Sequence, residues 1–365
     1  SPLVDNPPLG ELNMGDGNVL KDFVTWGVAN YPAKKYALII WDHGAGWKSG
    51  QQDTAVQKGI SIDETNGGDR LYMKEISTSL AAAGTPISLM GYDACVMGMT
   101  EVAFALKTNV TSDAVMVSSQ KNEPGDGWAY DLFLEQLRGN PTASPAVLGN
   151  YIVDTYQQFY LPTQGTDTTT LSTVSFAKMD SMKLLINAFV NAHAANPEWS
   201  IVGNAVNQAI AVEPKQPNYI DQWQLMDYLA TNLTNTASKN AAATVRNLLN
   251  TTILNSKTTN AFASNAKGLN IYFRKVADYE YKDYNGTWSD FAGQTLWPQF
   301  IMGYQASTTC ANAVSLQSGV PYNGTTIGST NNFPSGGYSC ANYNYNALDV
   351  SHVITTGATG TISAK

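Results

Sequence analysis

One histidine and one cysteine each stand at the end of a short apolar run. His43 lies at the end of the run in YALIIWDHG, and Cys95 lies at the end of the run in SLMGYDAC. The chain has 365 residues, of which three are histidines and three are cysteines. A free cysteine has a pKa of about 8.5, so it needs a neighbouring imidazole or a helix N-terminus to ionise near neutral pH. The pair could therefore attack a carbonyl carbon, with Cys95 as nucleophile and His43 as general base and acid.

The neighbours of these two residues extend the same chemistry. Gly44 has no Cβ, so its backbone N–H can approach a substrate oxygen, and with the N–H of Cys95 it could form an oxyanion hole. Asp42 adjoins His43, but adjacent strand residues face opposite ways, which favours a structural role for Asp42. Taken alone, a buried cysteine is usually an inert small hydrophobe. The joint position of the two residues favours catalysis.

The elements that must position this pair form an alternating pattern of strands and helices. We expect strands at 36–41, 86–90, 114–118, 171–177 and 268–274. Continuous apolar runs are typical of parallel strands buried on both faces, and sites form beyond the carboxyl ends of such strands. A helix predicted at 97–106 would point its free N–H groups back at Cys95, and a later one is predicted at 238–255. The pattern predicts an α/β fold with a mostly parallel sheet and helices on both faces.

Composition narrows the function classes. Charged residues make up 14% of the chain, against a usual ~25%, and the formal net charge is −8. This charge argues against a nucleic-acid binder, and no apolar run reaches the ~18 residues of a membrane span. Cys310 and Cys340 lie in a tail rich in Gly, Asn, Ser and Thr and could pair in an oxidising compartment. Cys95 is then the odd thiol.

The segments WDHGAGW and GYDACVMG resemble the two signatures of the clostripain family (C11) of the caspase-like cysteine peptidase clan. The likeness covers roughly residues 11–305 and extends to SSQKNEPGDGWAY, DQWQLMDYLATNL and GLNIYFR. Cys95 also follows His43 by about 50 residues, as in caspases. The resemblance implies a caspase-like α/β/α sandwich, a His43/Cys95 dyad, and an endopeptidase that cleaves protein or peptide substrates after Arg or Lys.

A preference for a basic residue requires an acidic pocket. Asp93 matches the pocket carboxylate of the family, and it lies two residues before Cys95 on the same strand face. Glu123 and Asp126, in the loop after the next strand, are candidates for a second carboxylate. The alternatives stay open: Asp93 could simply hold the rim through backbone hydrogen bonds, and the loop carboxylates could belong to a solvated turn.

The resemblance also implies maturation by self-cleavage between the two signatures. Lys58, in the long loop 44–70, is the predicted site, and a cleaved zymogen could keep its own N-terminal fragment as a partner. The thiol chemistry requires no cofactor. Clostripain-like enzymes can use calcium, for which Asp63, Glu64 and Asp69 are weak candidates because they lack a dense ligand pattern.

Two domains are expected. Residues 1–305 are predicted to form the caspase-like peptidase domain, without the opening strand and helix that family members usually carry. Residues 306–365 resemble the start of a bacterial pre-peptidase C-terminal domain, a partial all-β sandwich with a Cys310–Cys340 disulfide. The protein is therefore expected to be secreted or at the cell surface of a bacterium or archaeon. The alternatives are a noncatalytic surface binding or adhesion protein on the same scaffold, and a peptide ligase of the same clan.

Overall fold

The chain forms two compact units. The structure is a computed structural model that describes residues 10–47, 59–163, 168–259, 265–275, 284–310, 314–316 and 352–354. The first unit consists of Ser1–Phe273 and Asp283–Leu296, and the second of Arg274–Lys282 and Trp297–Lys365. Each unit is described by itself below.

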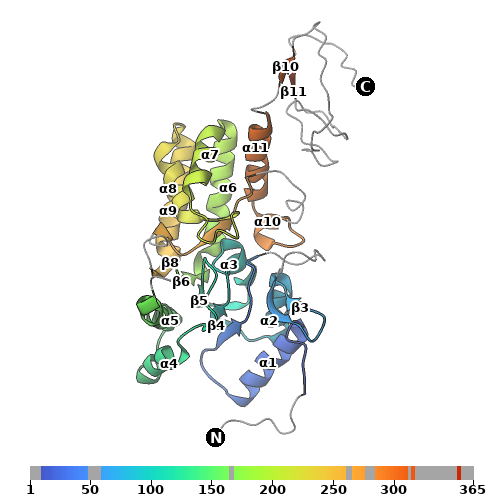
Figure 1. Cartoon of the computed structure of the whole chain (residues 1–365), viewed down its shortest axis with the longest axis vertical. Helices are drawn as coiled ribbons and strands as arrows, with labels where there is room; N and C mark the ends of the chain where they lie inside the picture. The colour runs from blue at the N-terminus through green and yellow to red at the C-terminus, as the bar shows by residue number, and fades with distance from the viewer. Residues whose placement is uncertain are drawn as a thin grey trace. The chain divides into compact units, whose positions relative to one another are not determined.

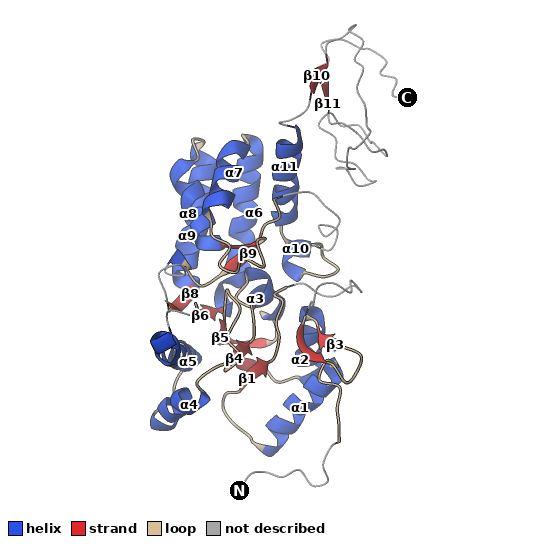
Figure 2. Cartoon of the chain, in the orientation of Figure 1, coloured by secondary structure: helices blue, strands red, loops and turns tan. Residues whose placement is uncertain are grey.

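A five-stranded sheet is the centre of the first unit (Figure 2). In spatial order its strands are β1 (Ala37–Trp41), β4 (Ile87–Asp93), β5 (Val110–Ser118), β6 (Thr170–Ser175) and β8 (Ile253–Thr258). Strands β1, β4 and β5 pair in parallel, and β6 runs antiparallel to both β5 and β8. Four of the five strands therefore run in one direction, and the predicted mostly parallel sheet is confirmed.

The burial of the strands explains their sequences. All seven residues of β4 are buried, as a central strand covered on both faces requires. Strand β1 lies at the edge, and there Leu38 and Ile40 are buried whereas the Trp41 side chain is 65% exposed. The first apolar run therefore reaches the surface as it approaches His43.

Helices cover both faces of this sheet. In the first unit they are α1 (Gly17–Asn30), α2 (Met73–Ala83), α3 (Thr100–Leu106), α4 (Tyr130–Gly139), α5 (Pro145–Tyr160), α6 (Met179–Ala195), α7 (Trp199–Gln208), α8 (Gln222–Asn232), α9 (Thr236–Thr252) and α10 (Asp290–Gln294). Figure 1 shows α4 and α5 on one side of the sheet and α1 and α2 on the other. The cluster between α5 and the strands includes Val117, Trp128, Ile152 and Tyr156. Helices α6 to α9 pack side by side beyond the sheet (Figure 1).

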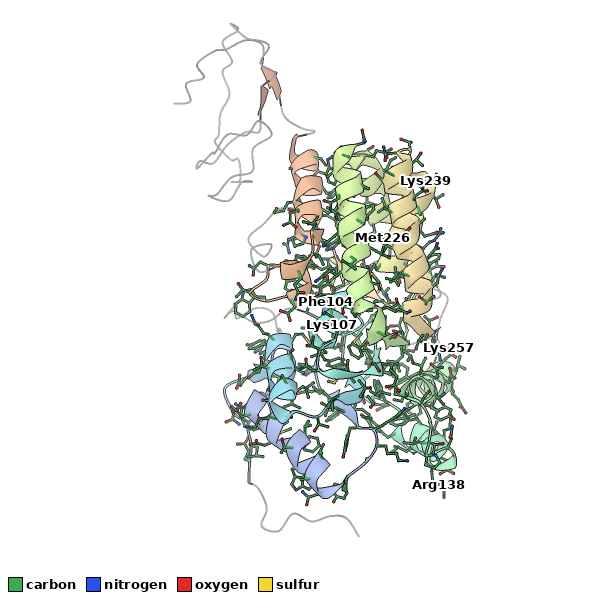
Figure 3. The ribbon with its side chains drawn as sticks, turned by 180° about the vertical axis from the view of Figure 1, so that it is seen from behind. Phe104, Lys107, Arg138, Met226, Lys239 and Lys257 are labelled. Atoms are coloured by element: carbon green, nitrogen blue, oxygen red, sulfur yellow. The ribbon has the colours of Figure 1, made fainter. Side chains whose placement is uncertain are left out.

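Helix α3 anchors the segment that follows Cys95. All seven of its residues are buried. The Phe104 ring meets Phe291 of α10 edge-on, with the ring centroids 5.5 Å apart. Just past the helix, Lys107 lies over the Phe104 ring, with its Nζ 4.9 Å from the ring centroid (Figure 3). Because α3 is fully buried and packs against an aromatic ring, it fixes the position of one end of the loop that follows Cys95.

Several predicted boundaries were wrong. The helix expected at 97–106 begins only at Thr100. The helix expected at 238–255 ends at Thr252, and the chain continues directly as strand β8. The strand expected at 268–274 is the short β9 (Asn270–Tyr272), which pairs with β7 (Tyr219–Asp221) in a separate sheet. The long loop after His43 contains the hairpin of β2 (Ile60–Asp63) and β3 (Asp69–Leu71).

The second unit contains the helix α11 (Trp297–Cys310) and the parallel pair β10 (Val314–Leu316) and β11 (His352–Ile354). Within it, the Gln305 Nε2 donates to the carbonyl of Arg274 over 3.0 Å. Most of the predicted β module lies outside the described residues, so the proposed domain boundaries stay a prediction. Among the helices that the structure describes, none has the length and apolar character needed to cross a membrane.

Candidate active site

The strand register places the two motifs side by side. Strands β1 and β4 are neighbours, Trp41 pairs with Asp93, and the N–H of Asp42 donates to the Asp93 carbonyl over 3.3 Å. His43 and Cys95 each follow two residues after this last pair. A Cβ added to Gly44 would lie 2.4 Å from the Cys95 carbonyl oxygen. The backbones that carry the imidazole and the thiol are therefore in contact at the carboxyl end of the sheet.

The Cys95 thiol is partly buried at this rim. It lies 4.0 Å from the carbonyl oxygen of Glu123, to which its S–H can donate. Burial raises the pKa of Cys95 above its usual value. The helix expected directly after Cys95 begins only at Thr100, so the thiol does not lie at its first residue. Activation of the thiol by a helix N-terminus or by the His43 imidazole stays a prediction.

The turn that carries His43 is held by its neighbour. One carboxylate oxygen of Asp42 accepts the backbone N–H of His43 over 2.5 Å, and the other accepts that of Ile62 over 2.8 Å. Asp42 thus links the end of β1 to the hairpin of β2. The His43 side chain is exposed. These contacts agree with the structural role expected for Asp42.

The residue after the thiol has an unusual backbone conformation. Val96 has a φ of +55°, which is rare for a β-branched residue and costs on the order of 1–3 kcal/mol. Its side chain is 1% exposed, and its N–H donates to the Lys121 carbonyl over 3.0 Å. The N–H of Gly98 donates to the Ser119 carbonyl over 2.7 Å. Burial and these hydrogen bonds hold the strained turn that presents Cys95.

Two of the three predicted pocket carboxylates lie together. Asp93 is 3% exposed, and its Oδ2 accepts the N–H of Trp128 over 3.1 Å and the hydroxyl of Tyr130 over 3.0 Å. The Oε2 of Glu123 accepts the indole N–H of Trp128 over 3.1 Å. Burial, together with the nearby Asp93 carboxylate, raises the pKa of Glu123 well above its usual range. Asp126 is exposed in the same loop and is not part of this pair.

Sequence reasoning missed a buried network of polar side chains that contacts the segment after Cys95. Gln120 Nε2 donates to Asp221 Oδ2 over 3.0 Å and to Asn270 Oδ1 over 2.7 Å. The N–H of Asn270 donates to the Gly98 carbonyl over 2.8 Å. All these side chains are at most 1% exposed. Gln120, Asp221 and Asn270 come from the three later segments that carried the family resemblance, and the network shows why those segments belong to one site.

Strand β7 packs over the histidine turn through its first residue, Tyr219. The Tyr219 hydroxyl donates to the Ala45 carbonyl over 2.8 Å, and Tyr219 is fully buried. Gly46 has a φ of +71°, and a Cβ added to it would lie 2.9 Å from the Tyr219 ring. This close approach requires glycine. The sequence after His43 therefore fits under a tyrosine from a distant part of the chain.

The acidic residues proposed for calcium do not fit that role. Asp63 is 8% exposed, and its oxygens accept the N–H groups of Met14, Thr65 and Asn66 and the hydroxyl of Thr65. These hydrogen bonds lower the pKa of Asp63. Asp69 accepts the Asn13 amide over 2.6 Å, and Glu64 is exposed. Asp63 is a structural clamp, and within the described ranges no three His, Cys, Asp or Glu side chains gather to hold a metal ion.

Three further predicted residues cannot be placed from the structure. Lys58 and Cys340 lie outside the described residues, and of Cys310 only the position at the end of α11 is described. Self-cleavage and the disulfide therefore stay predictions.

The fold and the strand-end pair define a protein of the caspase-like class, an α/β/α sandwich with a histidine and a cysteine at one rim. The sequence model of the clostripain family matches residues 3–304, and the chain belongs to this family. It is 34% identical to the clostripain of Hathewaya histolytica over 135 residues, which are 35% of this chain and 25% of that protein. The chain thus matches only about a quarter of the length of that relative.

Solved structures share the fold. A secreted C11 cysteine protease from Bacteroides thetaiotaomicron, in complex with an irreversible peptide inhibitor, has a TM-score of 0.61 at 18% identity and covers 77% of this chain and 78% of its own. An inactive zymogen C11 protease from Parabacteroides distasonis has a TM-score of 0.52 at 17% identity, with coverages of 73% and 71%. At these identities the likeness concerns the fold alone.

Proposed function

We propose that the protein is a cysteine endopeptidase that hydrolyses peptide bonds after arginine or lysine. The observation that carries this proposal is the contact between the Gly44 and Cys95 backbones at the end of two parallel strands. Membership of the clostripain family supports it. The activity needs no cofactor, because thiol and imidazole suffice for acyl transfer.

The reaction follows from the two side chains. The His43 imidazole takes the proton of the Cys95 thiol, and the thiolate attacks the carbonyl carbon of the scissile bond. The protonated imidazole then gives its proton to the departing amine, which leaves an acyl-thioester on Cys95. A water molecule that loses a proton to His43 attacks the thioester, releases the carboxylic acid, and restores the thiol.

The oxyanion of the tetrahedral intermediate is assigned to the backbone N–H groups of Gly44 and Cys95. A Cβ on Gly44 would lie 3.1 Å from the Cys95 nitrogen, so the two residues adjoin and only glycine leaves this space open. Removal of one such donor costs on the order of 10²- to 10³-fold in rate. The fixed turn at Val96 keeps the second donor in place.

Asp93 and Glu123 are proposed to receive the cation of the substrate. Both carboxyl groups adjoin the thiol segment, since Asp93 precedes Cys95 by two residues and the Glu123 carbonyl contacts the sulfur. A guanidinium or ammonium beside them favours their ionised forms and opposes the rise in the pKa of Glu123. Asp126, exposed in the same loop, is the weaker candidate.

Maturation and location extend the proposal. Cleavage after Lys58, between the two motifs, would convert a zymogen into a two-chain enzyme that keeps its N-terminal fragment. Secretion is supported by the relatives described as secreted. In purified protein, Lys58→Ala should slow the first cut or move it, whereas Cys95→Ala should leave the chain uncut. Normal processing of Lys58→Ala would rule out that site.

Fluorogenic peptides test the activity itself. Peptides with arginine or lysine before the reporter should be cleaved, and matched peptides with leucine or aspartate should not. Cys95→Ala and His43→Ala should each abolish release, and their melting temperatures should show that they are folded. If no basic peptide gives Cys95-dependent release, the protein is not this peptidase.

A further inference from the structure

Glu213 lies far from the cysteine in sequence, on the chain between α7 and β7, yet it is attached to the segment beside the thiol. Its Oε2 accepts the Asn122 N–H over 3.3 Å and lies 3.4 Å from the Lys121 ammonium nitrogen. Its Oε1 accepts the Lys215 N–H over 3.1 Å. Glu213 is 4% exposed. A pair this sheltered is screened less by salt than a surface pair.

This pair is joined to the nucleophile through the backbone. The segment 119–123 runs alongside Cys95–Gly98: the Val96 N–H donates to the Lys121 carbonyl over 3.0 Å, and the Cys95 sulfur lies 4.0 Å from the Glu123 carbonyl oxygen. The backbone of Lys121 therefore contacts the turn that carries Cys95, and its side chain contacts Glu213. A shift of either side chain would act on the turn through these contacts.

We propose that Lys121 and Glu213 are positioning residues that set the reactivity of the Cys95 thiolate with opposite signs. The proposal rests on the role of Cys95 as the nucleophile. The Lys121 ammonium stabilises the thiolate by attraction. The Glu213 carboxylate destabilises it by repulsion, and it also holds Lys121 in place. The reactivity of the Cys95 thiol thus depends on the balance between the positive charge of Lys121 and the negative charge of Glu213. The sequence motif around Cys95 includes neither residue.

The electrostatics of the thiol agree with this balance. Burial is the main cause that raises the pKa of Cys95, the Glu213 charge raises it further, and the Lys121 charge lowers it. Other titratable groups face the same region, and both carboxyls of the proposed substrate pocket are among them. The groups are His43, Asp93, Glu123 and Tyr156. These four residues are the same in all the variants proposed below. Differences in the pKa of Cys95 between the variants therefore come from Lys121 and Glu213.

The test is the rate of alkylation of Cys95 by iodoacetamide from pH 5.5 to 10. Glu213→Gln should lower the apparent pKa of the thiol, Lys121→Met should raise it, and the double variant should return toward wild type. A shift of one pKa unit changes the rate below that pKa by only about threefold, since a less basic thiolate is also a weaker nucleophile. Cys95→Ala supplies the background from Cys310 and Cys340.

Matched controls separate this pair from general effects. Lys215→Met makes the same change of charge on an exposed side chain of the Glu213 segment and should leave the pH profile unchanged. Lys121→Arg keeps the positive charge and should retain the wild-type pH profile of alkylation. This variant remains available for the test if Lys121→Met does not fold. Melting temperatures identify folded variants.

Three results would overturn the proposal. These are equal shifts for Lys215→Met and Lys121→Met, shifts of the same sign for Lys121→Met and Glu213→Gln, and no shift in either. Peptide cleavage is measured on the same samples. A wild-type protein that is alkylated as expected but cleaves no basic peptide would refute the peptidase function and leave the charge balance standing.

Discussion

Gly44→Ala adds one methyl group at the point where the segments that follow β1 and β4 touch. The added Cβ would lie 2.4 Å from the Cys95 carbonyl oxygen and 3.1 Å from both the Cys95 nitrogen and the Ala94 Cβ. Because real contacts of this kind stay above 3.0 Å, the backbones must separate by roughly 0.6 Å or more. The nearest neighbours are backbone atoms of Cys95, so they cannot move aside cheaply.

Two losses follow from this displacement. Overpacking of this kind costs about 1–3 kcal/mol, which for a domain of this size lowers the melting temperature by roughly 2–12 °C. A misplacement approaching 1 Å costs about 10²-fold in rate, because the imidazole, the thiol and the oxyanion donors no longer share one geometry. We therefore expect kcat/KM on an arginine or lysine peptide to fall by about 100-fold, mainly through kcat.

The matched control is Gly27→Ala in helix α1. No atom lies within 4 Å of the Cβ that it would add, and alanine is favoured over glycine in a helix interior by about 1 kcal/mol. This variant should melt at the same temperature as wild type or higher, with unchanged kcat/KM. Calorimetry and steady-state kinetics measure both quantities. If Gly44→Ala keeps wild-type activity and stability, the contact between the strand ends is wrong.

The remaining predictions concern charge, pH and packing. Asp93→Asn should lower kcat/KM on basic peptides by about 100-fold and leave a neutral peptide unaffected; unchanged selectivity in competition assays would move the pocket elsewhere. Burial raises the pKa of Glu101 to about 7, so the native state holds a proton that the unfolded state loses above pH ~4.5. The stabilising contribution of this proton is thus complete below that pH and is lost as the pH rises through about 7. Between pH 4.5 and 8, the free energy of unfolding of Glu101→Gln in urea should therefore rise by about 3 kcal/mol relative to that of wild type. Glu64→Gln, on an exposed side chain, is the control, and a wild-type pH dependence in Glu101→Gln would contradict the assignment. Tyr219→Phe removes the hydroxyl that donates to Ala45, so it should cost about 1–2 kcal/mol and lower kcat; an unchanged melting temperature would show that this bond contributes nothing.

The sequence predicted the two strands that precede His43 and Cys95, although β4 ends at Asp93 rather than at Met90, because continuous apolar runs before HisGly and AspAlaCys are local signals. It failed where the determining contact is distant. Val96 carries no sign of its positive φ, which burial and the Lys121 carbonyl impose. Strand β8 follows α9 without a glycine or proline, and only the β-branched residues at the junction, Thr251–Ile253, mark the change. Glu213 lies in a loop that nothing links to the cysteine until the chain is folded.

The bond between Asn270 and the Gly98 carbonyl also determines when the rim can be completed during synthesis. The ribosome has made both motifs once Cys95 has emerged, but the chain that fixes the turn after the thiol is still to come. At about 5–20 residues per second, β9 follows roughly 10–35 s later. A nascent chain therefore holds its histidine and cysteine without the geometry that joins them, and the ordered site arises only when nearly the whole first unit has left the ribosome.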